Sequence, residues 1–198
     1  RILGIVPKQF IPNYQEYYEG RWFSSATGEE PGEIEIAGQQ VPFGIDLLFT
    51  CGKVVVGVEI CEDLWMPIPP SSFQSVAGAN VLLNPSASNA LIGKAEYRRD
   101  LVVGQSGRCI AAYAYASAGP TESTTDLVFS GHCLVAENGR LLSESEHVST
   151  SHPLLRESSW HMVDVDIERL QNERRTVTSF DDWAPYVPRI YRNIECAL

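Results

Sequence analysis

The stretch that decides the fold is "KVVVGVEICEDLWMPIPP", Lys53 to Pro70. It opens with an apolar run rich in β-branched residues, which is typical of a buried strand. The run ends at the acidic segment 59–63, and a tryptophan and three prolines follow within seven residues. Cys61 therefore stands where a predicted strand ends, directly before the two carboxylates of Glu62 and Asp63.

Further apolar runs of this kind alternate with helical patterns, which predicts a layered fold of the α/β class. The "ENGR" segment at 137–140 indicates a hairpin turn, because Asn-Gly tolerates positive φ angles. We expect an exposed, mobile loop over Ser143–Ser159. The expected strands are Leu3–Val6, Lys53–Ile60, Ala79–Asn84, Cys109–Tyr115, Asp126–Ala136 and Met162–Val165, and the expected helices are Ser71–Gly78, Gly93–Arg108 and Ile167–Arg175.

Of the 198 residues, 44% are hydrophobic and 20% are charged, which suits one substantial folded domain. The formal net charge of −10 argues against a nucleic-acid surface, which requires clustered Lys and Arg. No apolar run approaches the ~20 residues that span a bilayer. The five cysteines are odd in number and form no CxxC pair, which argues against a disulfide framework or structural zinc and favours a reducing, cytoplasmic setting.

The residues alone leave two roles open for Cys61. A free cysteine at the end of an apolar strand is commonly a packing residue. A nucleophilic cysteine must instead reach its thiolate form, which Glu62 and Asp63 oppose unless a cation lies nearby. Lys8, in the segment "GIVPKQFIPNY", is the candidate cation. A sharp turn after the strand would also leave backbone N–H groups available to hold an oxyanion.

Four segments together resemble the nitrilase superfamily of carbon–nitrogen hydrolases, and within it the glutaminase domains of glutamine-dependent NAD synthetases. They are "GIVPKQFIPNYQEYYEGRWF", "VVGVEICEDLWMPIPPS", "NPSASNALIGKAEYRR" and "AGPTESTTDLVFSGHCLVAENGRLLSE". The resemblance implies a four-layer αββα sandwich, which we expect to be incomplete, with the early strands and helices missing. It further implies a partial hydrolase domain over 1–148 and a C-terminal arm over 149–198 that leads towards an absent synthetase domain.

The superfamily uses a Glu–Lys–Cys triad. By the resemblance, Cys61 looks like the nucleophile that attacks the side-chain amide of glutamine, and Lys8 like the cation that stabilises the oxyanion together with the N–H of Glu62. Ammonia leaves, and water then cleaves the thioester. The general-base glutamate of the family lies upstream of the lysine segment, outside this chain. Glu19 matches a second glutamate that orients Lys8 or the amide, and as a bare residue it reads equally well as an ordinary exposed helix acid.

Further residues match substrate contacts of the synthetase branch. Tyr14 matches a tyrosine that contacts glutamine, and Trp65 matches an aromatic residue that packs against the substrate. Glu62 is expected to bind the substrate. Ser88 and Lys94 match the α-amino and carboxylate end of glutamine, where a hydroxyl and a cation suit a zwitterion. Taken alone, Tyr14 and Trp65 are typical packing residues, and Lys94 is typical of a solvated helix start.

The resemblance also implies partners: L-glutamine, the synthetase domain of the same polypeptide and further copies in a homo-oligomer, with no nucleic acid and no membrane. The glutaminase step needs no metal or organic cofactor, and ATP and Mg²⁺ are expected only in the absent synthetase domain, where ammonia amidates deamido-NAD. Two alternatives remain open, a free-standing amidase for another small amide and a non-catalytic assembly module. No catalytic role is expected for the four histidines, because they lack metal-ligand spacing and the Glu–Lys–Cys chemistry does not use histidine: His132, His147, His152 and His161.

Overall fold

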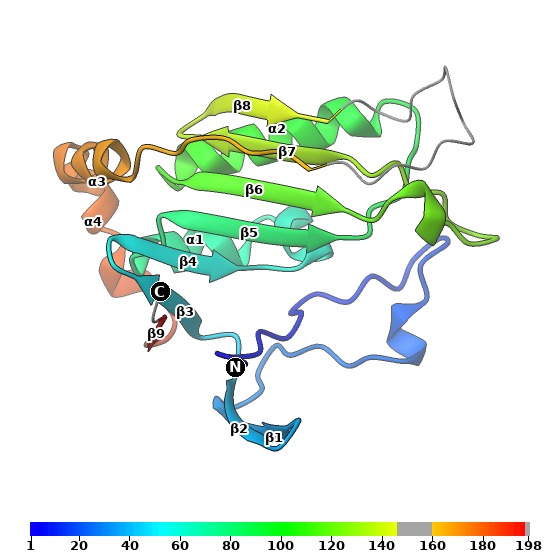
Figure 1. Cartoon of the computed structure of the whole chain (residues 1–198), viewed down its shortest axis with the longest axis horizontal. Coiled ribbons are helices and arrows are strands. Elements are labelled where there is room, and N and C mark those ends of the chain that lie inside the picture. Colours follow the sequence, from blue (N-terminus) through cyan, green and yellow to red (C-terminus); the bar gives the residue numbers. More distant parts are fainter. Residues whose placement is uncertain (146–159, 197–198) are drawn as a thin grey trace.

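The structure is a computed structural model of the chain that describes residues 1–145 and 160–196. A seven-stranded mixed sheet with the order β8-β7-β6-β5-β4-β3-β9 forms its frame, and a two-stranded hairpin, β1-β2, lies apart from it (Figure 1). The strands are β1 (Gly32–Ile36), β2 (Gln39–Phe43), β3 (Leu47–Cys51), β4 (Val54–Val58), β5 (Val81–Ser86), β6 (Ala112–Ser117), β7 (Cys133–Glu137), β8 (Arg140–Glu144) and β9 (Arg192–Glu195).

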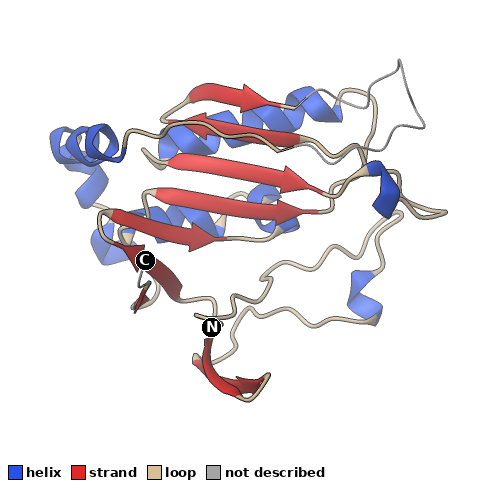
Figure 2. Ribbon diagram, in the orientation of Figure 1, coloured by secondary structure: helices blue, strands red, loops and turns tan. Residues whose placement is uncertain are grey.

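The centre of the sheet is parallel. β4 pairs with β5, and β5 pairs with β6, each in parallel register. Parallel neighbours need a crossover connection, and here α1 (Pro70–Val76) joins β4 to β5 while α2 (Lys94–Arg108) joins β5 to β6. Both helices cover the same face of the sheet (Figure 2). The carboxyl ends of β4 and β5 consequently meet at one edge, and the loops that follow them lie together there.

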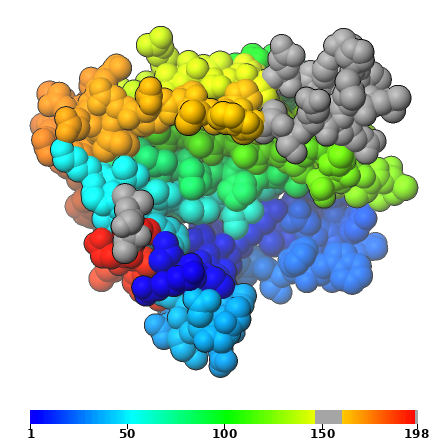
Figure 3. Space-filling model, in the orientation of Figure 1, coloured from blue at the N-terminus to red at the C-terminus, as the bar shows by residue number. Residues whose placement is uncertain are grey.

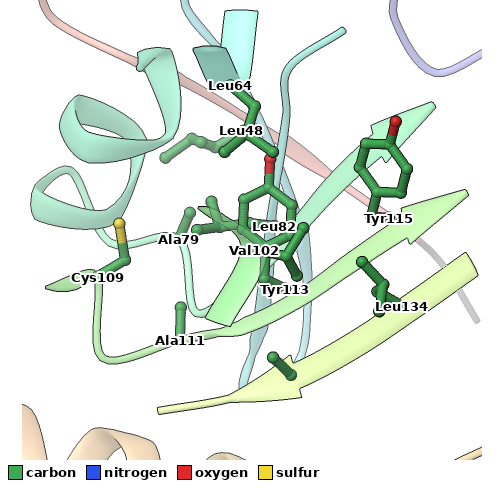
Figure 4. Close-up of a cluster of buried hydrophobic side chains, with 11 residues drawn as sticks. Leu48, Leu64, Ala79, Leu82, Val102, Cys109, Ala111, Tyr113, Tyr115 and Leu134 are labelled. Carbon is green, nitrogen blue, oxygen red and sulfur yellow. The ribbon is translucent and has the colours of Figure 1, made fainter. Parts of the chain in front are cut away.

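The main core fills the space between this face and the two helices (Figure 4). Leu82 and Tyr113 are opposite each other on β5 and β6, and neither is exposed to solvent. Gly57 of β4 lies on the same face, where a Cβ atom would come within 2.5 Å of the Gln74 side chain of α1. Glycine therefore allows the helix to approach the strand closely. Leu83 points the other way and is 37% exposed, so the face opposite α1 and α2 is open at this position.

The remaining helices lie in the N-terminal and C-terminal parts of the chain and in the loops between strands. The N-terminal segment, blue in Figure 3, lies between the β1-β2 hairpin and the main sheet. No described helix is long and apolar enough to cross a membrane. These helices are η1 (Glu19–Arg21), η2 (Cys61–Trp65), η3 (Pro120–Glu122), α3 (Ile167–Thr176), α4 (Thr178–Asp181) and η4 (Ala184–Tyr186), of which the η elements are 3-10 helices.

The C-terminal segment packs against the sheet in two places. Leu170 of α3 is fully buried against Ile110 and Ala112 at the start of β6. β9 adds a parallel edge strand to β3, where the Arg192 guanidinium forms a two-pronged ion pair with Asp46 at 2.6 and 2.8 Å. These contacts tie the end of the described chain to the sheet at both β6 and β3.

The structure confirms the predicted central strands as β4, β5 and β6, the three helices as α1, α2 and α3, and the "ENGR" hairpin between β7 and β8. Leu3–Val6 was wrong as a strand, because only Ile5 forms a bridge, to Phe43. Asp126–Ala136 is also wrong in its first half, since the segment from 123 to 132 is an irregular loop whose backbone N–H groups donate to the Ser123 and Thr124 hydroxyls.

Met162–Val165 was wrong as a strand, because this described segment has no strand pairing. β1, β2, β3 and β9 were not predicted. Most of the expected loop at Ser143–Ser159, together with His147 and His152, lies outside the described residues.

Arg174 holds α3 to the rest of the fold. Its guanidinium lies among backbone oxygens, and burial lowers its pKa to about 10. Within the described residues, its hydrogen bonds go to the last turn of α1 and to the segments before β5 and β6. The acceptors are the carbonyl oxygens of Ser75, Gly78, Ala79, Cys109 and Ile110.

We expect Arg174→Lys to destabilise the protein by about 1–3 kcal/mol, because one ammonium cannot reach carbonyls spread over two loops. With an m-value of ~2 kcal/mol/M, the urea midpoint of the complete protein would fall by roughly 0.5 M or more. Arg175→Lys is the matched control, since Arg175 is exposed and should leave the midpoint unchanged. Equal midpoints for both variants would contradict the role of Arg174.

Candidate active site

Cys61 is the first residue of η2 and lies at the sharp turn that follows β4. Its φ angle is 50°, a left-handed conformation that is rare for residues other than glycine. The residue is buried, with 7% of its surface exposed, and its backbone N–H donates to the Asn84 Oδ1 at 3.0 Å. Asn84 belongs to β5, so the neighbouring strand fixes the turn. The N–H of Cys61 is thereby occupied and is not an oxyanion donor.

Asp63 connects this turn to the N-terminal segment. Its buried carboxylate accepts the N–H of Ile60 at 2.8 Å, of Gln9 at 3.2 Å and of Phe10 at 2.9 Å. Burial raises the pKa of Asp63, and the three N–H bonds and the charge of Lys8 act against this rise. The sequence reasoning missed this role. The available signal was an acid three residues after a strand end, a spacing typical of helix capping.

Lys8 and Glu19 form an ion pair at 2.7 Å, and their side chains are 15% and 30% exposed. Glu19 is therefore a partner of Lys8 and not a solitary exposed acid. Burial raises the pKa of the Glu62 carboxyl, and the charge of Lys8 acts against this rise. Tyr14 donates its hydroxyl to both oxygens of Glu62 at 2.9 and 3.0 Å, and burial and this bond raise the pKa of Tyr14. These four residues form one polar wall beside Cys61.

Lys94, Trp65 and Asn89 form a second wall. The Lys94 ammonium lies 5.1 Å from the centre of the Trp65 ring and donates to the Asn89 Oδ1. Burial and the neighbouring Arg98 lower the pKa of Lys94, and the charge of Cys61 raises it. Lys94 is the first residue of α2, but it is half-buried and interacts electrostatically with Cys61, so it is not the solvated lysine that its position alone suggests.

Ser88 is held by a buried arginine. The Nη2 of Arg98 donates to the Ser88 Oγ at 2.9 Å and to the Asn89 carbonyl at 3.1 Å. Its Nη1 lies 2.9 Å from the Nδ1 of His132, which must accept because a guanidinium only donates. Arg98 is 1% exposed and was missed by the sequence reasoning. Its spacing of four residues from Lys94, which places both on one helix face, was the available signal.

The structure thus places all eight predicted site residues in two groups around the Cys61 turn, at the carboxyl ends of β4 and β5, and Glu62 interacts electrostatically with the lysine of each group. Among residues 1–145 and 160–196, no group of three or more His, Cys, Asp or Glu side chains is placed to hold a metal ion. A cavity of about 540 Å³ lies elsewhere, between α1, the end of α2 and the C-terminal segment. Its described lining, which includes Phe73, Phe180 and Trp183, contains none of the eight residues.

No family model matches the chain. The chain is 47% identical over 184 residues to the glutamine-dependent NAD(+) synthetase of Mycobacterium tuberculosis, a match that covers 91% of this chain and 26% of that relative. It is 31% identical over 190 residues to the synthetase of the same name from Saccharomyces cerevisiae, covering 90% of this chain and 25% of the relative. The chain therefore spans about a quarter of the length of these relatives.

Solved structures agree with these relatives. A glutamine-dependent NAD(+) synthetase from Cytophaga hutchinsonii superposes with a TM-score of 0.64 and 33% identity, covering 74% of this chain and 23% of that one. A carbon–nitrogen hydrolase from Helicobacter pylori superposes with a TM-score of 0.60 at 16% identity, covering 93% and 61%, which shows a shared fold alone.

The fold is accordingly that of the carbon–nitrogen hydrolases, in the form of a partial nitrilase-like sandwich, as predicted. Within that class, the chain is homologous to one segment of the glutamine-dependent NAD(+) synthetases, which confirms the resemblance.

We expect Asp63→Asn to loosen the N-terminal segment from the Cys61 turn. In either orientation of the amide, its NH₂ group faces at least one backbone N–H, and losing a buried acceptor costs about 1 kcal/mol or more. Amide hydrogen exchange at Ile60, or at Gln9 and Phe10, should accelerate about fivefold or more. Glu62→Gln is the control, because Glu62 accepts from the Tyr14 side chain and should leave these amides unchanged. Unchanged exchange at all three amides in Asp63→Asn would contradict this account.

Proposed function

We propose that this chain is the glutamine-hydrolysing part of a glutamine-dependent NAD(+) synthetase. The observation that carries the proposal is that η2, which begins at Cys61, contacts both lysine segments: Asp63 accepts from the residues after Lys8, and Trp65 lies against Lys94. The chain is also homologous to a segment of such enzymes. We assign the hydrolase part to residues 1–148 and an arm towards the synthetase part to residues 149–198.

The chemistry begins when the Cys61 thiol gives its proton to the general base and its sulfur attacks the side-chain amide carbon of glutamine. The oxyanion that forms is stabilised by the Lys8 ammonium and by the backbone N–H of Glu62, because the N–H of Cys61 is engaged with Asn84. Breaking the C–N bond leaves a γ-glutamyl thioester on Cys61 and releases ammonia, which takes its proton from the general acid. Water then attacks the thioester, releases glutamate and restores the thiol.

Glu19 positions Lys8 in this scheme. Its ion pair with Lys8 at 2.7 Å holds the ammonium on the side of the site formed by the N-terminal segment. Because Glu19 is already paired with this cation, we assign the proton transfers to a glutamate contributed from outside this chain, as the family resemblance implies.

The other end of glutamine is a zwitterion, and we assign its recognition to the second wall. Lys94 supplies one positive charge for the α-carboxylate, oriented by Trp65 and Asn89. Ser88 supplies a hydroxyl whose position the buried Arg98 fixes. Trp65 and Tyr14 supply apolar surface for the methylene groups between the two ends, and Glu62 orients the Tyr14 hydroxyl.

The wider assignments follow from the same homology. We propose that the ammonia amidates deamido-NAD in a synthetase part of the same polypeptide, that ATP and Mg²⁺ act there, and that the protein is a homo-oligomer. The glutaminase step uses no cofactor. A cytoplasmic location is supported by five free thiols. The alternative of an amidase for another small amide is not favoured, because the relatives that share 47% and 31% sequence identity with the chain are synthetases.

An electrophilic glutamine analogue such as a diazo-oxo-norleucine should label the complete protein at Cys61 and stop ammonia release. L-Glutamine should protect against labelling, whereas an unrelated small amide should not. Cys61→Ala should remove the label, and Cys133→Ala, which changes a thiol further along the chain, should retain it. Peptide mass spectrometry identifies the labelled residue. A label that persists in Cys61→Ala, or protection by the small amide alone, would overturn the proposed function.

A further inference from the structure

A row of buried polar groups lies beneath the Cys61 turn, on the helix-covered face of the sheet. Asn84, Tyr113 and Glu59 are each at most 1% exposed. Asn84 accepts the N–H of Cys61 through Oδ1 at 3.0 Å and donates through Nδ2 to the Tyr113 hydroxyl at 3.1 Å. Tyr113 donates to one oxygen of Glu59, and the N–H of Ser71 donates to the other oxygen at 2.8 Å.

The donors and acceptors in this row can point in only one direction. A backbone N–H only donates, so Asn84 must turn its oxygen to Cys61 and its NH₂ group to Tyr113. The Tyr113 hydroxyl then accepts from Asn84 and passes its own hydrogen to Glu59. Because Tyr113 and Ser71 both donate to Glu59, its carboxyl group has to accept at both oxygens, which is the bonding pattern of an ionised carboxylate.

Burial works against that ionised form and raises the pKa of Glu59 to about 7, although the bonds from Tyr113 and Ser71 lower it. The Ser71 hydroxyl also bonds the Glu59 carboxyl. A proton on Glu59 has to be donated to a hydroxyl, that of Tyr113 or that of Ser71, and in either case the carboxyl is no longer the charged acceptor that fixes the direction of the row. The row is therefore held firmly above about pH 7 and weakened below it. The titratable side chains that interact with Glu59 come from η2, the end of α2, β6 and the residue before β9, and they are Asp63, Cys109, Tyr113 and Tyr191.

We propose that Glu59 is a positioning residue for the nucleophile: its carboxylate, acting through Tyr113 and Asn84, fixes the backbone of Cys61 in the left-handed conformation that presents the thiol. Glu59 touches neither substrate nor sulfur in this scheme. The inference rests on the proposed function only for its effect on rate. The structural part, a directional hydrogen-bond row that ends at the N–H of Cys61, stands on the contacts alone.

The test compares glutamine turnover by the complete protein and its variants at pH 8 and pH 6. Glu59→Gln keeps the shape of the side chain but places an NH₂ group against a donor or takes the acceptor from Tyr113. At pH 8 its kcat should be about 10- to 100-fold below wild type, because small displacements of a nucleophile cost this much, with KM for glutamine changed less than about threefold. The ratio of wild-type kcat to Glu59→Gln kcat should be smaller at pH 6, because Glu59 is then protonated in the wild type and has also lost its charge.

Tyr113→Phe interrupts the same row one step closer to Cys61. Its kcat should fall by a similar factor at pH 8, and its difference from wild type should likewise be smaller at pH 6. Glu137→Gln is the matched control, since Glu137 is also buried in a strand and accepts a backbone N–H, from Asp166 at 2.8 Å. The kcat of Glu137→Gln should equal that of wild type at both pH values. Wild-type kcat in Glu59→Gln and Tyr113→Phe, or a loss of equal size at pH 8 and pH 6, would overturn the inference.

A measurement on the wild-type protein tests the same row if the variants fail to fold. The protection of the Cys61 amide against hydrogen exchange, corrected for the intrinsic rate, should be about fivefold or more higher at pH 8 than at pH 6 in the wild-type protein. Equal protection would overturn the inference even if Cys61 is the nucleophile. Conversely, pH-dependent protection of the Cys61 amide without labelling of Cys61 would support the hydrogen-bond row and overturn the proposed function.

Discussion

The carboxylate of Asp63 is the contact on which the candidate site depends. The N-terminal segment has little regular structure of its own, with a single bridge at Ile5 and the short helix η1. Its backbone is fixed beside the Cys61 turn by the N–H groups of Gln9 and Phe10, which donate to Asp63 from the residues directly after Lys8. Loss of that carboxylate would remove these backbone bonds to η2 and leave the half-exposed side-chain bonds between Tyr14 and Glu62, so the cation would be held less firmly beside the thiol.

Buried polar groups hold the site together from beneath. The left-handed conformation of Cys61 costs of order 1–3 kcal/mol, and such strain persists only where neighbouring contacts determine it. Here Asn84 takes the N–H of Cys61, and Arg98 fixes Ser88 on the loop after β5. A turn held in this way presents a thiol with little backbone movement during the reaction, as an attack within a defined geometry requires.

The central part of the fold could be predicted from the sequence because its signals are local. The β-branched runs of β4 and β5 and the apolar pattern of α2 are visible in consecutive residues, and the thiol at the end of β4 marks the site. The errors arise where contacts with a distant part of the chain decide the structure. Leu3–Val6 has the composition of a strand but pairs only through Ile5, and β9 is a strand because β3 leaves an edge beside it.

The site residues that the sequence did not indicate depend on distant contacts in the same way. Asp63 and Phe10 are 53 residues apart, and the burial of Arg98 beside Ser88 depends on how α2 lies on the sheet. Lys8 was found as the cation that a thiolate at Cys61 needs. Glu19 and Lys94 were found because the resemblance aligned them, and periodicity alone would have left both on a solvated surface.

The central claim is that these groups form one site in which glutamine lies with its amide at position 61 and its zwitterionic end at the second wall. A crystal structure of the complete Cys61→Ala protein with bound L-glutamine tests this most directly. The account predicts the side-chain amide carbon facing the methyl group that replaces the thiol, Lys8 on the amide oxygen, and the α-carboxylate within hydrogen-bond distance of Lys94. Glutamine bound in the reverse orientation, or outside the carboxyl ends of β4 and β5, would contradict it.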